Sequence, residues 1–187
     1  MEVIKTELEG VLILEPRIFT DGRGYFFECY NQREFLAKTG LDVTFVQDNE
    51  SFSSYGVLRG LHFQKGEYAQ AKLVRVIEGK VLDVAVDIRK GSPTFGKWTS
   101  VDLSGENHRQ FFIPRGFAHG FSVLSPTARF QYKCDNFYAP GQEGAVAWND
   151  PDLAIDWKLP AADVLLSEKD SRHPLLKDSP YLFEYKK

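Results

Sequence analysis

The chain has 187 residues, enough for one domain of ordinary size, and 43% of them are hydrophobic. Its net charge of −3 supplies no basic field for nucleic acid or an anionic membrane, and no stretch approaches the ~18 apolar residues of a membrane-spanning helix. The two cysteines, Cys29 and Cys134, lie far apart and form no CxxC pair, so we expect a soluble protein of the reducing cytoplasm.

The aromatic content favours a mainly β protein. Aromatic residues make up 14% of the chain, and large flat side chains suit pleated strands better than helical bundles. Strand-like segments, separated by turn-forming residues, are expected at 10–16, 24–30, 72–77, 81–88, 97–103, 110–113, 118–124 and 128–134. This spacing predicts a β-sandwich or β-barrel.

Helical signals are few. Asn31 followed by Glu34 resembles a helix N-cap with its capping glutamate, and Gly40 supplies a stop, so one short helix is expected between them. A second helical turn is expected at 161–166. Because there are no repeats or linkers, we predict a single domain for residues 1–187. Its parts are N-terminal strands over about 1–50, a barrel over about 51–150 and an irregular C-terminal segment over about 151–187.

The clearest strand pattern lies at 81–88. Its even-numbered residues are apolar, whereas Asp83 and Asp87 fall on the opposite side, which predicts a strand with a polar face. Gly79 stands between this segment and the strand at 72–77. Because glycine permits a tight turn, the two strands are predicted to pair as a hairpin.

A run that contains charged and titratable side chains suited to catalysis starts at Arg59. It contains His62, which titrates near neutral pH, and Lys72 follows as a second cation. A base beside positive charge suits enolate chemistry on an anionic substrate. The alternative, that His62 is an interior histidine with a structural hydrogen bond, remains open at this point.

A second motif matches half of a cupin signature. The segment 114–119 reads P-x-G-x-x-H, in which proline and glycine form a corner before a strand that carries the histidine. In the other half, Gly56 and His62 fit, but Gln64 takes the place of the second histidine. His62 and His119 with Glu67 would bind a metal only weakly, because Gln64, at the position of the missing histidine, is a poor ligand. We therefore expect no metal.

Further motifs run in order through about residues 1 to 176. They are Phe19-x-Asp21-x-Arg23-Gly24, Phe45-Val46-Gln47-Asp48-Asn49, Gly56-Val57-Leu58-Arg59-Gly60-Leu61-His62, Lys72-Leu73-Val74, Asp83-Val84-Ala85-Val86-Asp87-Ile88-Arg89, Ser92-Pro93-Thr94-Phe95-Gly96, Ile113-Pro114-x-Gly116-Phe117-Ala118-His119-Gly120-Phe121 and Leu166-Ser167-x-Lys169-Asp170. Together they resemble the dTDP-4-dehydrorhamnose 3,5-epimerase family. The resemblance implies a mainly β, cupin-type double-stranded β-helix, or jelly-roll barrel, with a few short helices.

The resemblance also implies a reaction. Family members invert carbons 3 and 5 of dTDP-4-dehydro-6-deoxy-D-glucose to give dTDP-4-dehydro-β-L-rhamnose, in dTDP-L-rhamnose biosynthesis. Both carbons flank a ketone, so each proton can leave through an enolate. This chemistry needs a base on one face of the sugar, an acid on the other and positive charge near the carbonyl oxygen. It requires no metal and no redox cofactor.

By motif position, four residues resemble the family's catalytic set. His62 is the expected base and Asp170 its orienting partner, Tyr132 is the expected acid, and Lys72 the cation at the enolate oxygen. From the residues alone, plain structural roles are favoured: a turn carboxylate for Asp170, a packing ring for Tyr132 and a solvated strand-end lysine for Lys72.

The remaining matches concern substrate binding. Arg59 and His119 match contacts to the sugar and diphosphate, and Tyr138 resembles an aromatic that stacks on thymine. Further matches to nucleotide-sugar contacts are Arg23, Gln47, Asn49, Lys169, Glu28 and Glu143. Family members are homodimers with an intermolecular sheet, so Arg23 and Glu28 are candidates for the partner's site. Plain surface carboxylates and a loop aromatic are the alternatives for Glu28, Glu143 and Tyr138.

Two positions depart from the usual family pattern, Glu67 and Arg115, and neither belongs to the expected catalytic set. They leave the sugar stereochemistry open, so a 3-epimerase that inverts carbon 3 alone is the nearest alternative. A non-catalytic cupin that binds a nucleotide sugar and a metal-dependent cupin dioxygenase are the others.

Overall fold

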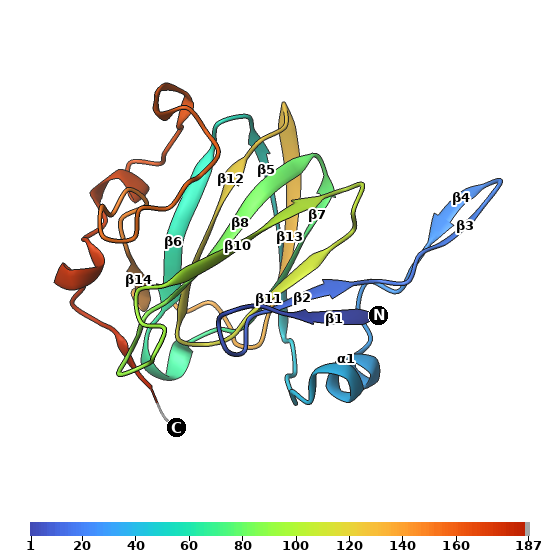
Figure 1. Ribbon diagram of the computed structural model, residues 1–187, viewed down its shortest axis with the longest axis horizontal. Coiled ribbons are helices and arrows are strands. Elements are labelled where there is room, and N and C mark those ends of the chain that lie inside the picture. Colours follow the sequence, from blue (N-terminus) through green and yellow to red (C-terminus); the bar gives the residue numbers. More distant parts are fainter. Residues whose placement is uncertain (186–187) are drawn as a thin grey trace.

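The computed structural model describes residues 1–185, which form two antiparallel sheets packed face to face (Figure 1). The larger sheet has the order β1 (Glu2–Lys5), β2 (Leu12–Glu15), β11 (Gln110–Ile113), β7 (Lys72–Glu78), β13 (Thr127–Cys134) and β5 (Gln47–Ser54). The smaller sheet has the order β10 (Trp98–Ser104), β8 (Lys80–Asp87), β12 (Phe117–Val123), β6 (Leu58–Gln64) and β14 (Glu143–Ala145). The prediction of a mainly β fold is confirmed.

Between the sheets lies a core of side chains from both. Val74 and Phe130 of the larger sheet pack with Ala85 and Phe121 of the smaller one, and all four are buried. The Phe121 and Phe130 rings stack with their centroids 4.2 Å apart. This aromatic contact fixes the spacing of the two sheets at one end of the barrel, next to the strands that carry the candidate site.

Strand β8 forms as predicted, and Asp83 and Asp87 lie on the face opposite its even-numbered apolar residues, but both carboxylates are fully buried. The strand is central in its sheet, and the C-terminal segment covers the outer face, so both of its faces are enclosed and each carboxylate is held by a cation or imidazole. The predicted hairpin of β7 with β8 is wrong, because the two strands belong to different sheets. The turn at Gly79 has φ of 82°, but it carries the chain from one sheet to the other.

The predicted helix is α1 (Gln32–Thr39). The Asn31 side chain accepts hydrogen bonds from the backbone N–H groups of residues 33 and 34, and Gly40 ends the helix with φ of 73°. Glu34 does not complete a capping box, because its carboxylate accepts a hydrogen bond from the N-terminal ammonium of Met1 at 2.8 Å. The helix packs Phe35 against Phe112 of β11, an interior strand of the larger sheet.

The C-terminal segment lies across the outer face of the smaller sheet, as an irregular trace beside β6 and β14 (Figure 1). Leu153, Trp157 and Leu176 bury this face together with the apolar residues of β8. Its short elements are the 3₁₀ turns η2 (Ala161–Asp163), η3 (Asp170–Arg172) and η4 (Leu176–Asp178), and β15 (Phe183–Glu184), which pairs with β9 (Arg89–Lys90). The end of the predicted segment, residues 186–187, lies outside the described residues, and the three-part division of one domain stays a prediction. Another 3₁₀ turn is η1 (Gly66–Tyr68).

Near the N-terminus, a hairpin of β3 (Phe19–Asp21) and β4 (Gly24–Phe26) projects away from the barrel (Figure 1). Phe19, Tyr25 and Phe26 are 50%, 60% and 67% exposed on it. Strand β4 covers only the first three residues of the strand predicted at 24–30. Within residues 1–185, no helix has the length and apolar character to cross a bilayer.

Candidate active site

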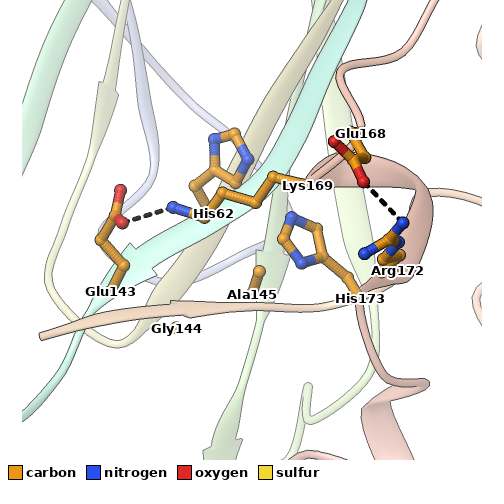
Figure 2. Close-up of a pocket in the computed structure, with 8 residues that line it drawn as sticks. All are labelled: His62, Glu143, Gly144, Ala145, Glu168, Lys169, Arg172 and His173. Carbon is orange, nitrogen blue, oxygen red and sulfur yellow. Dashed lines mark hydrogen bonds and ion pairs between the residues drawn. The ribbon is translucent and has the colours of Figure 1, made fainter. Parts of the chain in front are cut away.

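Two openings meet at His62. One is a cavity of about 240 Å³ at the mouth of the barrel, and the other is an open pocket of about 540 Å³ beside η3 (Figure 2). The barrel cavity is lined by Gln47, Asn49, His62, Phe63, Gln64, Gln70, Lys72, Tyr132, Tyr138 and Glu143. Six of the residues predicted to bind substrate or act in catalysis thus face one space with His62, namely Gln47, Asn49, Lys72, Tyr132, Tyr138 and Glu143.

Strand β6 brings His62 to this position. It pairs with β12, where His119 is opposite His62, and with β14, where Ala145 is opposite His62. The backbones of β6 and β12 come unusually close at Gly60, where a Cβ atom would lie only 2.6 Å from the Cα of Gly120. Only glycine fits at that crossing, next to the two histidines.

Asp170 on η3 holds the His62 ring. Its Oδ1 lies 2.5 Å from His62 Nε2 and 3.1 Å from His173 Nε2, and its Oδ2 accepts a hydrogen bond from the Ser167 hydroxyl at 2.9 Å. The residue is 4% exposed. Burial opposes ionisation, but the hydrogen bonds and the His62 charge outweigh it and lower the Asp170 pKa to about 2. The side chain is therefore a carboxylate throughout the neutral range.

This pairing determines which His62 nitrogen is free. A neutral imidazole carries one proton, and a carboxylate at Nε2 fixes that proton on Nε2. The lone pair is then on Nδ1, which is the nitrogen available to accept a proton. The arrangement is a histidine base oriented by a carboxylate.

Lys72 and Tyr132 also line the barrel cavity, and they are on the paired strands β7 and β13. The Lys72 ammonium is 5.7 Å from the centroid of the Tyr132 ring. Burial lowers the pKa of Lys72, and the charges of Cys134 and Asp83 oppose this shift. Burial also raises the pKa of Tyr132, so the phenol keeps its proton at neutral pH. A proton donor and a poorly solvated cation therefore face the cavity together.

His119 forms a second, deeper pair. Its Nε2 lies 2.8 Å from Asp83 Oδ1, and both side chains are buried. Burial raises the pKa of Asp83, while His119 and Lys72 oppose the shift. The second carboxylate oxygen, Oδ2, has no hydrogen-bond partner among residues 1–185. His119 does not line the barrel cavity but packs behind it, 6.2 Å from the Phe130 ring by centroid distance.

The residues expected to bind the nucleotide sugar are in part linked to one another. Gln47 donates a hydrogen bond to Asn49 at 2.9 Å and accepts one from the Tyr138 backbone N–H at 2.9 Å. Lys169 and Glu143 form an ion pair at the border of the two openings (Figure 2).

Arg59 is exposed on β6, where its guanidinium donates hydrogen bonds to the Ser53 hydroxyl at 3.2 and 3.3 Å. It does not line the barrel cavity, but its charge acts to lower the Tyr132 pKa against the effect of burial. A planar guanidinium is suited to binding phosphate oxygens.

Arg23 and Glu28 line neither opening around His62 in the same chain. Arg23 is on the projecting hairpin, where it pairs with Asp21 at 2.6 Å. Glu28 is exposed and accepts a weak hydrogen bond from Asn31 at 3.3 Å.

The donor set does not fit a cupin metal site. The Gln64 amide donates to the backbone oxygens of Tyr68 and Phe137 and accepts from the backbone N–H of Ala139. It ties β6 to the loop at 137–139, so both ends of this amide already have backbone partners. Glu67 is exposed on η1 and lines neither opening.

Sequence reasoning missed three supporting residues. Asp83 orients His119, Ser167 holds Asp170, and His173 adds a second imidazole to the same carboxylate. Burial lowers the pKa of His173, so its ring is neutral at neutral pH. Its spacing of three residues from Asp170 was the available signal, since that spacing places both on one side of a helical turn.

Comparisons with known proteins agree with this geometry. Residues 5–178 match the family model described as dTDP-4-dehydrorhamnose 3,5-epimerase. A curated protein of that name from Salmonella typhimurium is 58% identical over 179 residues, which is 94% of this chain and 96% of the relative.

Two solved structures are similar over nearly their whole length. The crystal structure of dTDP-4-dehydrorhamnose 3,5-epimerase from Elizabethkingia anophelis has a TM-score of 0.93 and 60% identity, covering 97% of this chain and 99% of that one. The Legionella pneumophila dTDP-6-deoxy-D-glucose-3,5-epimerase, in complex with dTDP-4-keto-L-rhamnose, has a TM-score of 0.95 and 49% identity, covering 100% and 99%. The predicted cupin-type jelly-roll barrel is confirmed by this likeness.

Proposed function

Because the chain belongs to the dTDP-4-dehydrorhamnose 3,5-epimerase family, we propose that its barrel cavity performs the family reaction with His62, Asp170, Tyr132 and Lys72 as the catalytic set. The enzyme is an isomerase of dTDP-L-rhamnose biosynthesis, which inverts carbons 3 and 5 of dTDP-4-dehydro-6-deoxy-D-glucose. The observation that carries the assignment is the 2.5 Å contact of His62 with Asp170, at the wall of a cavity that also holds Lys72 and Tyr132.

The first half of each inversion is removal of a proton. His62 Nδ1 takes the proton from the carbon next to the ketone, and the C–H electron pair moves onto the carbonyl oxygen as an enolate. Asp170 stabilises the resulting imidazolium, because its low pKa keeps it charged. The Lys72 ammonium stabilises the enolate oxygen, and its effect is strong because the group is poorly solvated.

The second half is return of a proton to the opposite face. Tyr132 donates its phenolic proton to the enolate carbon, the carbonyl re-forms, and the configuration is inverted. Solvent then restores the proton of Tyr132 and takes the one on His62. Repetition at the other carbon completes the reaction, so the substrate gains and loses equal numbers of protons and electrons.

For the substrate's other parts we propose roles by chemistry. Arg59 binds diphosphate oxygens through its guanidinium, and Tyr138 stacks on thymine. His119, which is opposite His62 on β12 and does not line the cavity, supports the sugar-binding end from behind the cavity wall. Gln47, Asn49, Glu143 and Lys169 form the polar wall around the nucleotide. The linked hydrogen bonds among Gln47, Asn49 and the backbone of Tyr138 support this, because they hold several contacts as one unit.

We further propose that the active enzyme is a homodimer. The hairpin of β3 and β4 projects from its own barrel with exposed aromatic rings, and Arg23 lies at its tip. Arg23 and Glu28 would then reach the partner's cavity, which accounts for their distance from their own. The proposed location is the cytoplasm, in accord with two unpaired thiols at Cys29 and Cys134.

The reaction is tested by incubation with dTDP-4-dehydro-6-deoxy-D-glucose in deuterated water. Each inversion replaces one substrate proton with a solvent deuteron, so the expected product carries deuterium at both carbon 3 and carbon 5. Label at carbon 3 alone identifies a 3-epimerase. Absence of label at both carbons identifies a non-catalytic binder and refutes the proposed mechanism.

A further inference from the structure

A second imidazole lies against the catalytic carboxylate, with no part in the mechanism above. His173 Nε2 is 3.1 Å from Asp170 Oδ1, the same oxygen that His62 Nε2 contacts at 2.5 Å. The two rings are perpendicular, with an interplanar angle of 89° and centroids 5.6 Å apart. Both rings face the open pocket beside η3 (Figure 2).

We propose that His62, Asp170 and His173 form a binding site for a divalent transition-metal ion, best matched by Zn²⁺, and that the bound ion inhibits the enzyme. One ligand atom from each residue lies within 4.8 Å of the other two. Around a tetrahedral zinc with bonds of about 2.0–2.2 Å, ligand atoms are roughly 3.3 Å apart. Ring shifts on the order of an ångström bring the three atoms to that spacing.

The chemistry of the ligands selects the class of ion. Two imidazole nitrogens and one carboxylate oxygen favour zinc and its neighbours over magnesium or calcium, which prefer oxygen ligands. Asp170 supplies a carboxylate oxygen, Oδ1, which contacts both imidazole nitrogens. Its second oxygen is held by Ser167, a contact of the kind that fixes the orientation of a ligating carboxylate.

The pocket leaves room for the ion and for further ligands. It has a volume of about 540 Å³, and the His62 side chain is 40% exposed. The other charged groups on its wall are paired, Glu143 with Lys169 and Glu168 with Arg172. Asp170 does not line the pocket itself, but its Oδ1 contacts the two imidazoles that do, and no Lys or Arg among residues 1–185 pairs with it.

Inhibition follows from the single proton of a neutral imidazole. With the ion on Nε2 of His62, the remaining ring proton must lie on Nδ1. Nδ1 is the nitrogen that accepts the substrate proton, so the metal-bound ring cannot act as the base. This part of the inference rests on the role proposed for His62, whereas metal binding does not depend on it.

Binding is tested first, without substrate, by calorimetric titration of the chelator-treated enzyme with Zn²⁺ and by visible absorption with Co²⁺. The test variant is His173→Gln, which keeps a donor for Asp170 but is a poor ligand. The control is Glu168→Gln, on the wall of the same pocket. The expected result is one ion per wild-type chain, affinity lowered at least about tenfold by His173→Gln, and no change in the control. No binding, or equal affinity in His173→Gln, overturns the proposal.

Inhibition is then measured as the rate of epimerisation with added Zn²⁺, relative to each variant's own metal-free rate. Wild type should lose activity as the site fills and regain it with chelator, and His173→Gln should need at least about tenfold more zinc. A filled site with an unchanged rate overturns the inhibitory part. If the metal-free enzyme incorporates no deuterium, the proposed function fails instead, and the binding result is unaffected.

Discussion

Replacing Asp170 with asparagine tests how His62 becomes a base. The change keeps the size of the side chain but removes the charge that lies 2.5 Å from His62 Nε2. The Asp170 pKa falls from 3.8 to about 2 in the folded protein, with hydrogen bonding and charge from His62 as the leading favourable contributions. Solvent at the pocket screens part of this, which leaves about 1–2 kcal/mol of stabilisation for the imidazolium, or roughly 5- to 30-fold in rate.

The tautomer adds to this loss. An asparagine can present its NH₂ group to Nε2, which places the ring proton on Nδ1 and blocks the base. A comparable substitution in a histidine–aspartate pair costs about 10⁴-fold, so we expect kcat to fall on the order of 10³- to 10⁴-fold. The affinity for dTDP should stay within a few-fold, because Asp170 does not line the barrel cavity.

The assay is the rate of deuterium incorporation at carbons 3 and 5, with dTDP binding measured by calorimetry. The matched control is Asp178→Asn, an exposed aspartate of the same C-terminal segment, which should behave as wild type. If Asp170→Asn retains more than about a third of the wild-type rate while binding dTDP normally, the carboxylate does not orient the base, and the reasoning above is refuted.

Three further predictions concern the acid, the cation and a structural carboxylate. Tyr132→Phe should lower kcat for inversion about 10²- to 10⁴-fold yet leave deuterium exchange with retention at carbon 3, and loss of both would contradict its role as the acid. Lys72→Met should lower kcat about 10²- to 10³-fold with dTDP affinity nearly unchanged, and a selective loss of affinity would reassign it to binding. Burial acts against the charge of Asp87, but hydrogen bonds from Arg89, Ser92 and Thr94 hold its pKa below 3.8. That carboxylate therefore stabilises the fold above pH about 4 and loses its effect as pH falls through the native pKa. Asp87→Asn should lower the free energy of unfolding by about 2–4 kcal/mol at pH 7, with the gap to wild type closing in acid, and a constant gap would exclude the charge as its cause.

The sequence predicted the strands that have a clear pattern and missed those that do not. The segment 110–113 forms β11 with the same bounds, because a short apolar run is buried on both faces. β5 reads QDNESFSS and carries little apolar alternation, since it lies at the edge of its sheet. Its pairing with β13 is a tertiary effect that local propensity does not encode.

The hairpin of β7 with β8 was predicted from a turn that does form. A glycine with positive φ permits a tight turn but does not decide whether the next strand pairs or crosses to the opposite sheet. That choice depends on the competing partners β11 and β13 for β7, and β10 and β12 for β8. The same topology buries Asp83, whereas the strand pattern predicted a polar face without indicating whether that face is buried.

The candidate site was predicted mainly through the family resemblance. Residues 62 and 170 are 108 positions apart, and no local pattern indicates that the C-terminal segment carries Asp170 back to β6. The resemblance predicted their pairing, and the structure has them in contact. His173 was not predicted, because the motif that carries Asp170 ends at that residue. Its ring contacts the Asp170 carboxylate and does not line the barrel cavity.

The central claim is that His62 is the base for both inversions, and His62→Asn tests it most directly. Asparagine preserves polarity at the cavity wall but cannot accept the substrate proton. The measurement is deuterium incorporation at carbons 3 and 5 from deuterated water, together with the dissociation constant for dTDP. We expect exchange to disappear at both carbons while dTDP binds within a few-fold of wild type. Exchange at the wild-type rate at either carbon would contradict it.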